Sequence, residues 1–315
     1  MSVISILLTI AGLCVFETIS SIDNAIINAE VLSTVSPRAR RFFLGFGLLT
    51  AVVVVRGVLP WLVVWAVLPQ LGFLGAFTAS FSGDPLVHSA MLTAAPVLLV
   101  GGGTFLILLF LHWLFVEPKN FGLHAERFFA GRSVWFSAAA LFIVAAITLL
   151  SSTRDFRMVW STVIGLLVFA VSHGLKENAE SGEEMLLKRH YSDLRKLLYL
   201  EIIDATFSVD GVLGAFAFTL SIPLILLGNG LGALVVRQLT MGNISRVRKY
   251  FYLKNGAMYS IFFLGLIMVS EAFGMEFPAW ISPVVTFLIV GFFFWKSARE
   301  LKMRAGDLVE AVGKK

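Results

Sequence analysis

The sequence predicts an all-α integral membrane protein with about nine transmembrane helices, and three observations lead to this prediction. Hydrophobic residues fill 58% of the 315 positions and charged residues only 14%, whereas soluble domains are about 45–50% apolar and about 25% charged. Several apolar runs reach the roughly 20 residues that cross a hydrocarbon core. Basic residues gather in alternate loops, as the positive-inside rule requires of a multi-pass protein.

Nine apolar runs are long enough to span a bilayer. The first is too long for one straight crossing, which predicts a tilt or a break. It carries no basic stretch in front of its apolar core and stays apolar past any cleavage site, so we expect a retained first span. No linker rich in Pro or Ser divides the chain, so one transmembrane domain is expected over 1–315. The predicted spans are 4–35, 42–69, 92–116, 134–151, 157–174, 198–219, 222–240, 251–272 and 279–297.

The loops between these spans predict the orientation. Those after spans one, three, five and seven are basic, as is the C-terminal tail, whereas those after spans two, six and eight contain no Lys or Arg. The fourth loop departs from this pattern with Arg154 and Arg157. The N-terminus is therefore predicted on the outer side of the cell membrane and the C-terminus in the cytoplasm. The formal net charge of +5 then belongs to cytoplasmic loops and predicts no nucleic-acid partner.

Two acidic segments resemble each other and predict an inverted repeat. Segments 16–24 and 203–211 align on their last aspartates, and an arginine recurs in the span after each. With the N-terminus outside, the two segments cross the membrane in opposite senses, as in transporters whose sites lie near the midplane. The predicted halves are approximately 1–174 and 198–297, joined by the cytoplasmic loop 175–197. The matched pairs are Glu17 with Asp204, Ser21 with Ser208, Asp23 with Asp210, and Arg56 with Arg237.

Five carboxylates in these segments are the candidate metal ligands. A charge at the centre of a membrane helix costs about 2.5–3.5 kcal/mol on insertion scales, so such a residue faces a cavity, a partner or an ion. The alternative is that the carboxylates lock helices together in pairs or stay protonated. The candidate ligands are Glu17, Asp23, Glu201, Asp204 and Asp210, with possible support from Ser21, Asn24, Ser208, Arg56 and Arg237.

The spacing of the carboxylates predicts that helices 1 and 6 are broken. Residues 201 and 204 are three apart and share a helix face. Residues 17 and 23 are six apart, like 204 and 210, which places each pair on different sides of an unbroken helix. Breaks near 20–24 and 207–211, where Ser, Asn and Gly weaken the helix, would turn all five toward one site.

The oxygen ligands predict a hard cation, because carboxylate, amide and carbonyl oxygens suit Mg²⁺, Ca²⁺ and Mn²⁺. Cys14 is either a soft accessory ligand or a buried structural cysteine. Arg56 is predicted to be a counter-charge to the carboxylates in the ion-free state. Arg237 has the same role or is an ordinary cytoplasmic anchor.

Four polar residues at the cytoplasmic ends of spans three and five form a second candidate group. They line an ion vestibule or are merely interfacial, and they are His112, Glu117, His173 and Glu177. The sequence contains no HExxH, G-x-S-x-G or Walker A motif, so we expect neither an enzyme nor an ATP-driven pump, and no cofactor.

At the two acidic motifs, Glu17-x-x-x-Ser-Ile-Asp-Asn and Glu201-x-x-Asp-x-x-Phe-Ser-Val-Asp-Gly, the chain resembles the TerC family of bacterial membrane proteins. That family lies within the LysE-like transporter superfamily, and the stretch 200–240 is similar to an uncharacterised subgroup of it. The resemblance implies manganese efflux, a link to tellurite resistance, and an ion-binding role for the acidic residues of the motifs. Ser-Ile-Asp-Asn and Gly211 depart slightly from the family's usual pattern, which leaves the ion preference open.

These observations predict a secondary transporter that exports a divalent cation, Mn²⁺ above others, from the cytoplasm by proton antiport. A Ca²⁺/H⁺ exchanger would use the same oxygen ligands. From another class, the chain would be a membrane scaffold or a stress-response component without transport. The expected partners are the metal ion as cargo and the lipid bilayer, and the oligomeric state stays open.

Overall fold

The computed structural model describes residues 2–47, 56–67, 69–81, 85–119, 122–188, 191–240, 247 and 249–313. Every regular element in these ranges is helical, which confirms the all-α prediction. Six of the described helices are long and apolar enough to cross a membrane. The protein is therefore an all-α, multi-pass membrane protein, and the predicted count of nine spans is not confirmed.

The described helices overlap the predicted spans, although several of their bounds differ. The six candidate spanning helices are α1 (Val3–Ser20), α7 (Pro85–Phe115), α9 (Ser133–Ser152), α10 (Phe156–Lys188), α14 (Leu253–Ala272) and α15 (Ile281–Gly313). The other elements are α2 (Ile22–Ser33), α3 (Pro37–Phe42), η1 (Phe43–Gly47), α5 (Arg56–Val67), η3 (Pro69–Leu71), α6 (Gly72–Phe81), α8 (His124–Phe129), α11 (Asp193–Ala215) and α12 (Ile222–Gln238).

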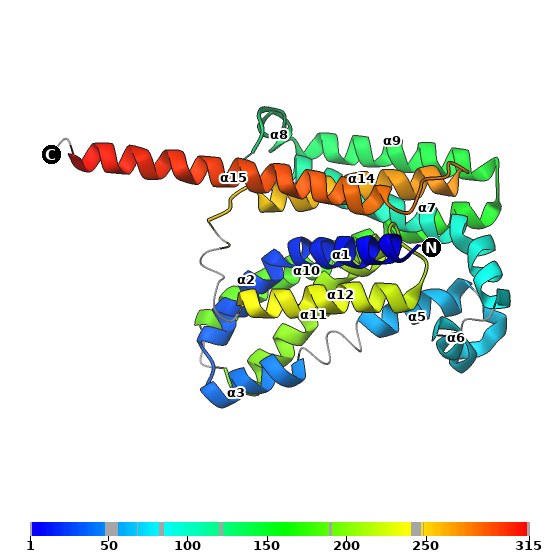
Figure 1. The fold of residues 1–315 in the computed structure, drawn as a ribbon, viewed down its shortest axis with the longest axis horizontal. Helices are drawn as coiled ribbons and strands as arrows, with labels where there is room; N and C mark the ends of the chain where they lie inside the picture. Colours follow the sequence, from blue (N-terminus) through cyan, green and yellow to red (C-terminus); the bar gives the residue numbers. More distant parts are fainter. Residues whose placement is uncertain are drawn as a thin grey trace.

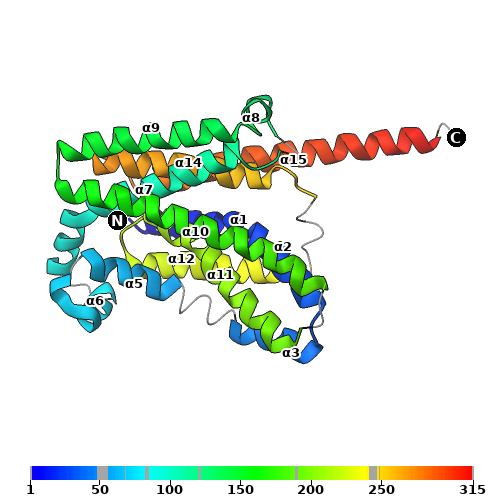
Figure 2. The same cartoon turned by 180° about the vertical axis from the view of Figure 1, so that it is seen from behind.

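Helix α7 lies at the centre of the bundle, where it packs against α10 on one side and α14 on the other (Figure 1). Helix α1 packs along α12, and α11 crosses beside α2 and α10 (Figure 2). The C-terminal half of α15 projects beyond the bundle. Helix α9 lies on the outside and buries only 6% of its apolar span within the protein, as expected of a helix whose other contacts are with lipid.

The predicted break in the first span is present at Ser21, which separates α1 from α2. Hydrogen bonds still cross the break, since the Ser21 amide donates to the Glu17 carbonyl over 3.1 Å and the Ala25 amide to the Ser21 carbonyl over 2.9 Å. The chain is thus kinked there and not unwound.

The predicted break in the sixth span is wrong. Helix α11 runs without interruption through 207–211 and ends only at Ala215. Ser208 lies within the unbroken helix, and its hydroxyl donates to the Asp204 carbonyl one turn earlier over 2.7 Å. Gly211 allows the side chain of Glu17 to pack against α11, since a Cβ at this position would lie 2.5 Å from Oε2 of Glu17.

Several helices extend beyond the apolar runs that predicted them. Helix α10 continues to Lys188, so most of the predicted loop 175–197 is helical, and α7 begins at Pro85 and not at 92. Helix α15 continues past 297 to Gly313, and α6 lies within the expected loop 70–91. Hydropathy marks where a helix leaves the apolar layer, whereas backbone propensity and capping decide where it ends.

Helices α7 and α10 cross with their backbones in close contact. A Cβ added to Gly165 would lie 2.3 Å from the Gly101 carbonyl oxygen. The Ser161 hydroxyl donates to the Val97 carbonyl over 2.5 Å at the same crossing. Small residues and interhelical hydrogen bonds are the usual means of helix association in lipid, where no hydrophobic effect drives the helices together.

Replacing Gly165 with alanine is expected to destabilise the protein by about 1–3 kcal/mol, the usual cost of an overpacked site, because the nearest atom belongs to backbone that cannot rotate away. Gly174→Ala is the matched control in the same helix, since a Cβ there meets nothing within 4 Å. That change should leave stability equal or raise it by up to about 1 kcal/mol through helix propensity. Thermal unfolding in detergent measures both, and equal midpoints would contradict the close crossing.

Candidate functional site

The two acidic segments lie against each other and run in opposite directions. Gly214 packs on the ring of Phe16, and further along the Asn24 side chain donates a hydrogen bond to Asp204. At the far end, Nζ of Lys196 donates to Oγ1 of Thr34 over 2.8 Å. Successive contacts thus pair ascending positions of α1 and α2 with descending positions of α11. This antiparallel seam is consistent with the inverted repeat, which stays a prediction.

The middle of the seam holds a buried ion pair. Nζ of Lys176, from α10, lies 2.5 Å from Oδ2 of Asp210, and the two side chains are 14% and 11% exposed. The other oxygen of Asp210, Oδ1, is buried and accepts no hydrogen bond from the residues that the structure describes. Glu17 is 1% exposed, contacts Gly211, and accepts a hydrogen bond from the Ser21 hydroxyl over 2.8 Å. Two carboxylates and one lysine therefore meet here, away from bulk water.

A second pair of carboxylates lies further along α11. Asp204 accepts the hydrogen bond of Asn24, and Glu201 lies one turn away, beside η1. A Cβ on Gly47 would lie 2.3 Å from Oε1 of Glu201, so this carboxylate contacts the segment that follows α3. The predicted ligands Glu201 and Asp204 are thus neighbours of each other, at a different place from the Asp210 pair.

Asp23, the last predicted ligand, takes part in a third group. Nζ of Lys254, from the first turn of α14, lies 3.0 Å from Oδ2 of Asp23 and 2.7 Å from Oε2 of Glu117. These side chains are between about a third and a half exposed. One lysine therefore bridges two carboxylates that come from different helical segments.

A cavity of about 700 Å³ connects the first and third groups. Asp210 and Lys176 line it at one place, and Asp23, Glu117 and Lys254 at another. The predicted vestibule residues His112, His173 and Glu177 also line it, and the two imidazole rings lie with their centroids 3.9 Å apart. These residues therefore line a cavity, and their role in an ion vestibule stays a prediction.

The structure does not gather the five carboxylates into one cluster. Among the described residues, no group of three or more His, Cys, Asp or Glu side chains is placed to hold a metal ion. The physical reason is that α11 is unbroken, so Asp204 and Asp210 point to different sides of it. In this conformation the cavity carboxylates bind lysine ammonium groups, and their role as metal ligands stays a prediction.

The structure describes one of the two arginines that were predicted as counter-charges. The side chain of Arg56, the first residue of α5, lies outside the described part of the chain. Arg237 is half-buried near the end of α12, and its Nε is buried without a hydrogen-bond partner among the described residues. The counter-charges among the described residues are Lys176 for Asp210 and Lys254 for Asp23. Lys176 follows the fifth predicted span by two residues, so its position in the sequence indicates a cytoplasmic loop and no partner.

The segment between α7 and α9 closes part of the cavity wall. Lys119 lies there, with its Nζ 3.6 Å from the centroid of the Trp113 ring, and burial lowers the pKa of Lys119 to about 8. Glu126 in α8 is fully buried, and accepts hydrogen bonds from the Leu123 amide over 2.8 Å and from the Asn255 side chain over 2.6 Å. Glu126 thereby attaches α8 to α14.

Burial raises the pKa of Glu126 above its ordinary value, against the effect of its hydrogen bonds. A carboxyl whose folded pKa is raised binds its proton more tightly when docked, so docking of α8 is most stable at low pH and weakens as pH rises through the folded pKa. We expect hydrogen exchange of the α8 amides, corrected for intrinsic rates, to quicken with pH. Glu126→Gln should flatten this dependence. Protection that instead increases with pH would contradict the assignment.

Comparisons with known proteins agree with a membrane protein. The sequence profile of a family described as "Protein of unknown function (DUF475)" matches residues 22–304, which is most of the chain. The "Uncharacterized membrane protein YceF" of Bacillus subtilis (strain 168) is 29% identical over 128 residues, which are 38% of this chain and 50% of that protein. The matched region thus spans about half the length of this relative. No solved structure matches the chain.

Proposed function

We propose a function from the site itself, because the chain belongs to the DUF475 family, whose members are described as proteins of unknown function. The protein transports a divalent cation across the membrane through the cavity that contains Asp210, and it is not an enzyme. The observation that supports this proposal is the buried pair of Lys176 and Asp210 at the wall of a polar cavity inside a membrane protein.

A buried carboxylate that already binds a cation is suited to bind a different one. Asp210 and Glu17 together carry two negative charges in a place of low polarity, where charges interact strongly. Lys176 neutralises one of them in the ion-free conformation. An arriving divalent cation would displace the ammonium group toward the cavity, which is lined by further carboxylates.

Displacement of Lys176 gives a reason for alternating access. With the lysine in place, only one of the two negative charges of the ion-free seam is uncompensated while the carrier changes conformation. With the cation bound, the seam is neutralised by the cargo instead. The intermediate state, with neither cation, is the costly one, because an unpaired buried charge destabilises a protein by several kcal/mol. The carrier would therefore change conformation only with Lys176 or the transported cation bound to the carboxylates.

Manganese is the cation that we favour, and export the direction. Oxygen ligands suit Mn²⁺, Mg²⁺ and Ca²⁺ alike, and the resemblance of the acidic motifs to the TerC family supports manganese among them. Protons are the proposed counter-ion, since the sequence carries no ATP-binding motif. A Ca²⁺/H⁺ exchanger remains the second candidate, and a scaffold without transport the third.

Flux of ⁵⁴Mn²⁺ into proteoliposomes, with and without an imposed pH gradient, tests the proposal. We expect uptake above that of protein-free liposomes, faster when the interior is acidic, and competition by unlabelled Mn²⁺ stronger than by Ca²⁺. Stronger competition by Ca²⁺ would favour the exchanger. Absence of flux with every divalent cation tried, from protein that is folded and oriented in both directions, would leave the scaffold.

A further inference from the structure

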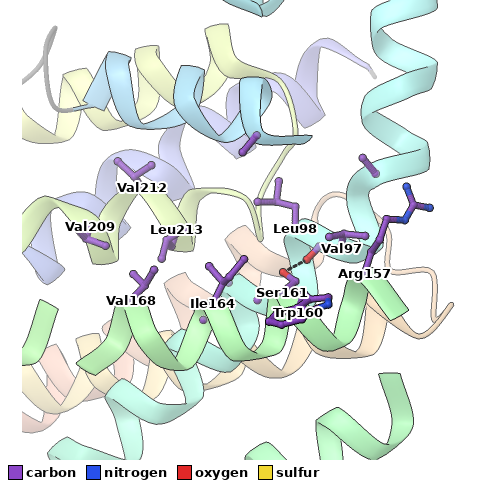
Figure 3. A pocket seen from close by; sticks show the side chains of 15 residues that line it. Val97, Leu98, Arg157, Trp160, Ser161, Ile164, Val168, Val209, Val212 and Leu213 are labelled. Atoms are coloured by element: carbon purple, nitrogen blue, oxygen red, sulfur yellow. Dashed lines mark hydrogen bonds between the residues drawn. The ribbon is translucent and has the colours of Figure 1, made fainter. Parts of the chain in front are cut away.

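A second cavity, of about 450 Å³, lies apart from the polar one, between α5, α7, α10 and α11. Figure 3 shows Val209, Val212 and Leu213 of α11 facing Ile164 and Val168 of α10 across it. Its walls are almost wholly apolar. The Ser161 hydroxyl at its edge already donates to the Val97 carbonyl.

Water is a poor occupant of this cavity, because a buried water needs two to four polar partners. An apolar occupant would gain contacts with every wall. In a bilayer the apolar groups present at high concentration are lipid acyl chains, and the cavity is bounded by Trp160 and Ile164, which are 58% and 55% exposed on a membrane-spanning helix. An acyl chain would therefore gain apolar contacts in the cavity, and it could enter from the bilayer past the exposed side of α10.

One end of the cavity is lined by an arginine that pairs with a carboxylate outside the lining. Arg157 lines the cavity at the start of α10, and Figure 3 shows its guanidinium group at the rim. Its Nη2 lies 2.8 Å from Oδ2 of Asp155, and its Nε donates to the same oxygen over 3.0 Å. The hydrogen bond to Arg157 lowers the pKa of Asp155, so both signs are present at neutral pH. Arg157 is also one of two basic residues in the loop that departed from the positive-inside pattern.

We propose that this cavity binds the acyl chain of an aminophospholipid, with the phosphate at Arg157 and the ammonium group at Asp155. A zwitterionic headgroup of the phosphatidylethanolamine type matches the charge pair, since a phosphate accepts from guanidinium and a primary ammonium donates to carboxylate. A choline headgroup cannot donate a hydrogen bond to Asp155, and a glycerol headgroup offers no positive charge.

The position of the cavity gives the bound lipid a consequence for the transport helix. Val209 and Val212 flank Asp210 in the sequence of α11, and they contact the cavity while Asp210 pairs with Lys176. An acyl chain in the cavity would support α11 against α10, next to the place where the buried ion pair joins the same two helices. The lipid site itself does not depend on which ion the protein carries.

Native mass spectrometry of delipidated full-length protein, titrated with phosphatidylethanolamine, phosphatidylcholine or phosphatidylglycerol of identical acyl chains, tests the proposal. We expect phosphatidylethanolamine to bind about tenfold more tightly than the other two, which corresponds to one charge-assisted hydrogen bond. Equal binding of all three would overturn the headgroup assignment.

Matched variants locate the site. Val168→Phe fills the cavity and should weaken phosphatidylethanolamine binding about tenfold, whereas Val171→Phe, on the exposed face of the same helix, should not. Ala94→Leu fills the cavity from α7 and provides an independent check if the first variant folds poorly. Arg157→Gln should weaken binding, whereas Arg154→Gln, an exposed neighbour outside the cavity, should not.

Asp155→Asn should make phosphatidylethanolamine and phosphatidylcholine bind equally. Filling variants that bind lipid like the wild type would show that the cavity is not the site. An effect of Arg154→Gln as large as that of Arg157→Gln would show that the binding is general attraction to basic charge.

Discussion

Asp210→Asn is expected to reduce divalent-cation flux at least about 100-fold. The substitution removes a charge and almost no volume, and leaves the ammonium group of Lys176 buried without its partner. Removing one partner of a buried pair typically costs about 3–5 kcal/mol of stability. The transported cation would also lose one of the two carboxylates of the seam, an interaction of about 1.5–3 kcal/mol, and each 1.4 kcal/mol is a tenfold change in binding. The measurement is the initial rate of ⁵⁴Mn²⁺ uptake into proteoliposomes that contain equal amounts of inserted protein.

The double variant Asp210→Asn with Lys176→Met separates transport from folding. It removes both charges of the pair, so it should recover much of the stability lost in the single variant and none of the flux. Glu300→Gln is the control for loss of an acidic residue elsewhere, since Glu300 pairs with Arg304 on α15. Near-normal flux in Asp210→Asn would show that the cation does not use this carboxylate.

Lys176→Met alone is also expected to have a large effect. It should lower the stability of the ion-free protein and raise its affinity for Mn²⁺. Without its built-in cation, Asp210 is left unpaired beside Glu17, so the ion-free protein should lose about 3–5 kcal/mol of stability. A divalent cation can now bind without displacing the ammonium group. Apparent Mn²⁺ affinity should therefore rise, while turnover falls because the ion-free carrier cannot return with uncompensated charge.

Thermal unfolding in the presence and absence of Mn²⁺ measures this effect, because a ligand that binds only the folded state stabilises it by RT ln(1 + [L]/Kd), which grows as the affinity rises. Lys176→Met should unfold at a lower temperature than the wild type without metal and show a larger upward shift with it. Lys249→Met, an exposed lysine outside the cavity, should change neither value. Equal Mn²⁺-induced shifts in the wild type and Lys176→Met would contradict the role of Lys176 as a stand-in for the transported cation.

The sequence by itself determined the class of protein and the residues worth testing. Apolar runs predict spanning helices, because in the bilayer the backbone can form hydrogen bonds only with itself. The helices α1, α7, α9, α10, α14 and α15 overlap those runs, although α7, α10 and α15 extend beyond them. The cost of charge in hydrocarbon makes Asp210 and Glu17 candidate site residues from the sequence alone. The kink at Ser21 was also predictable, from a stretch of weak helix formers.

Only the tertiary structure decided which charges meet. Hydropathy places Lys176 just after the fifth predicted span and Lys254 near the start of the eighth, and assigns neither a partner. Their long side chains reach into the cavity and bind Asp210 and Asp23. The continuity of α11 likewise depends on contacts between helices, since Gly211 is required for the approach of Glu17 and does not break the helix. Helix packing decides which side chains from distant segments form ion pairs and contacts. The local sequence pattern does not predict them.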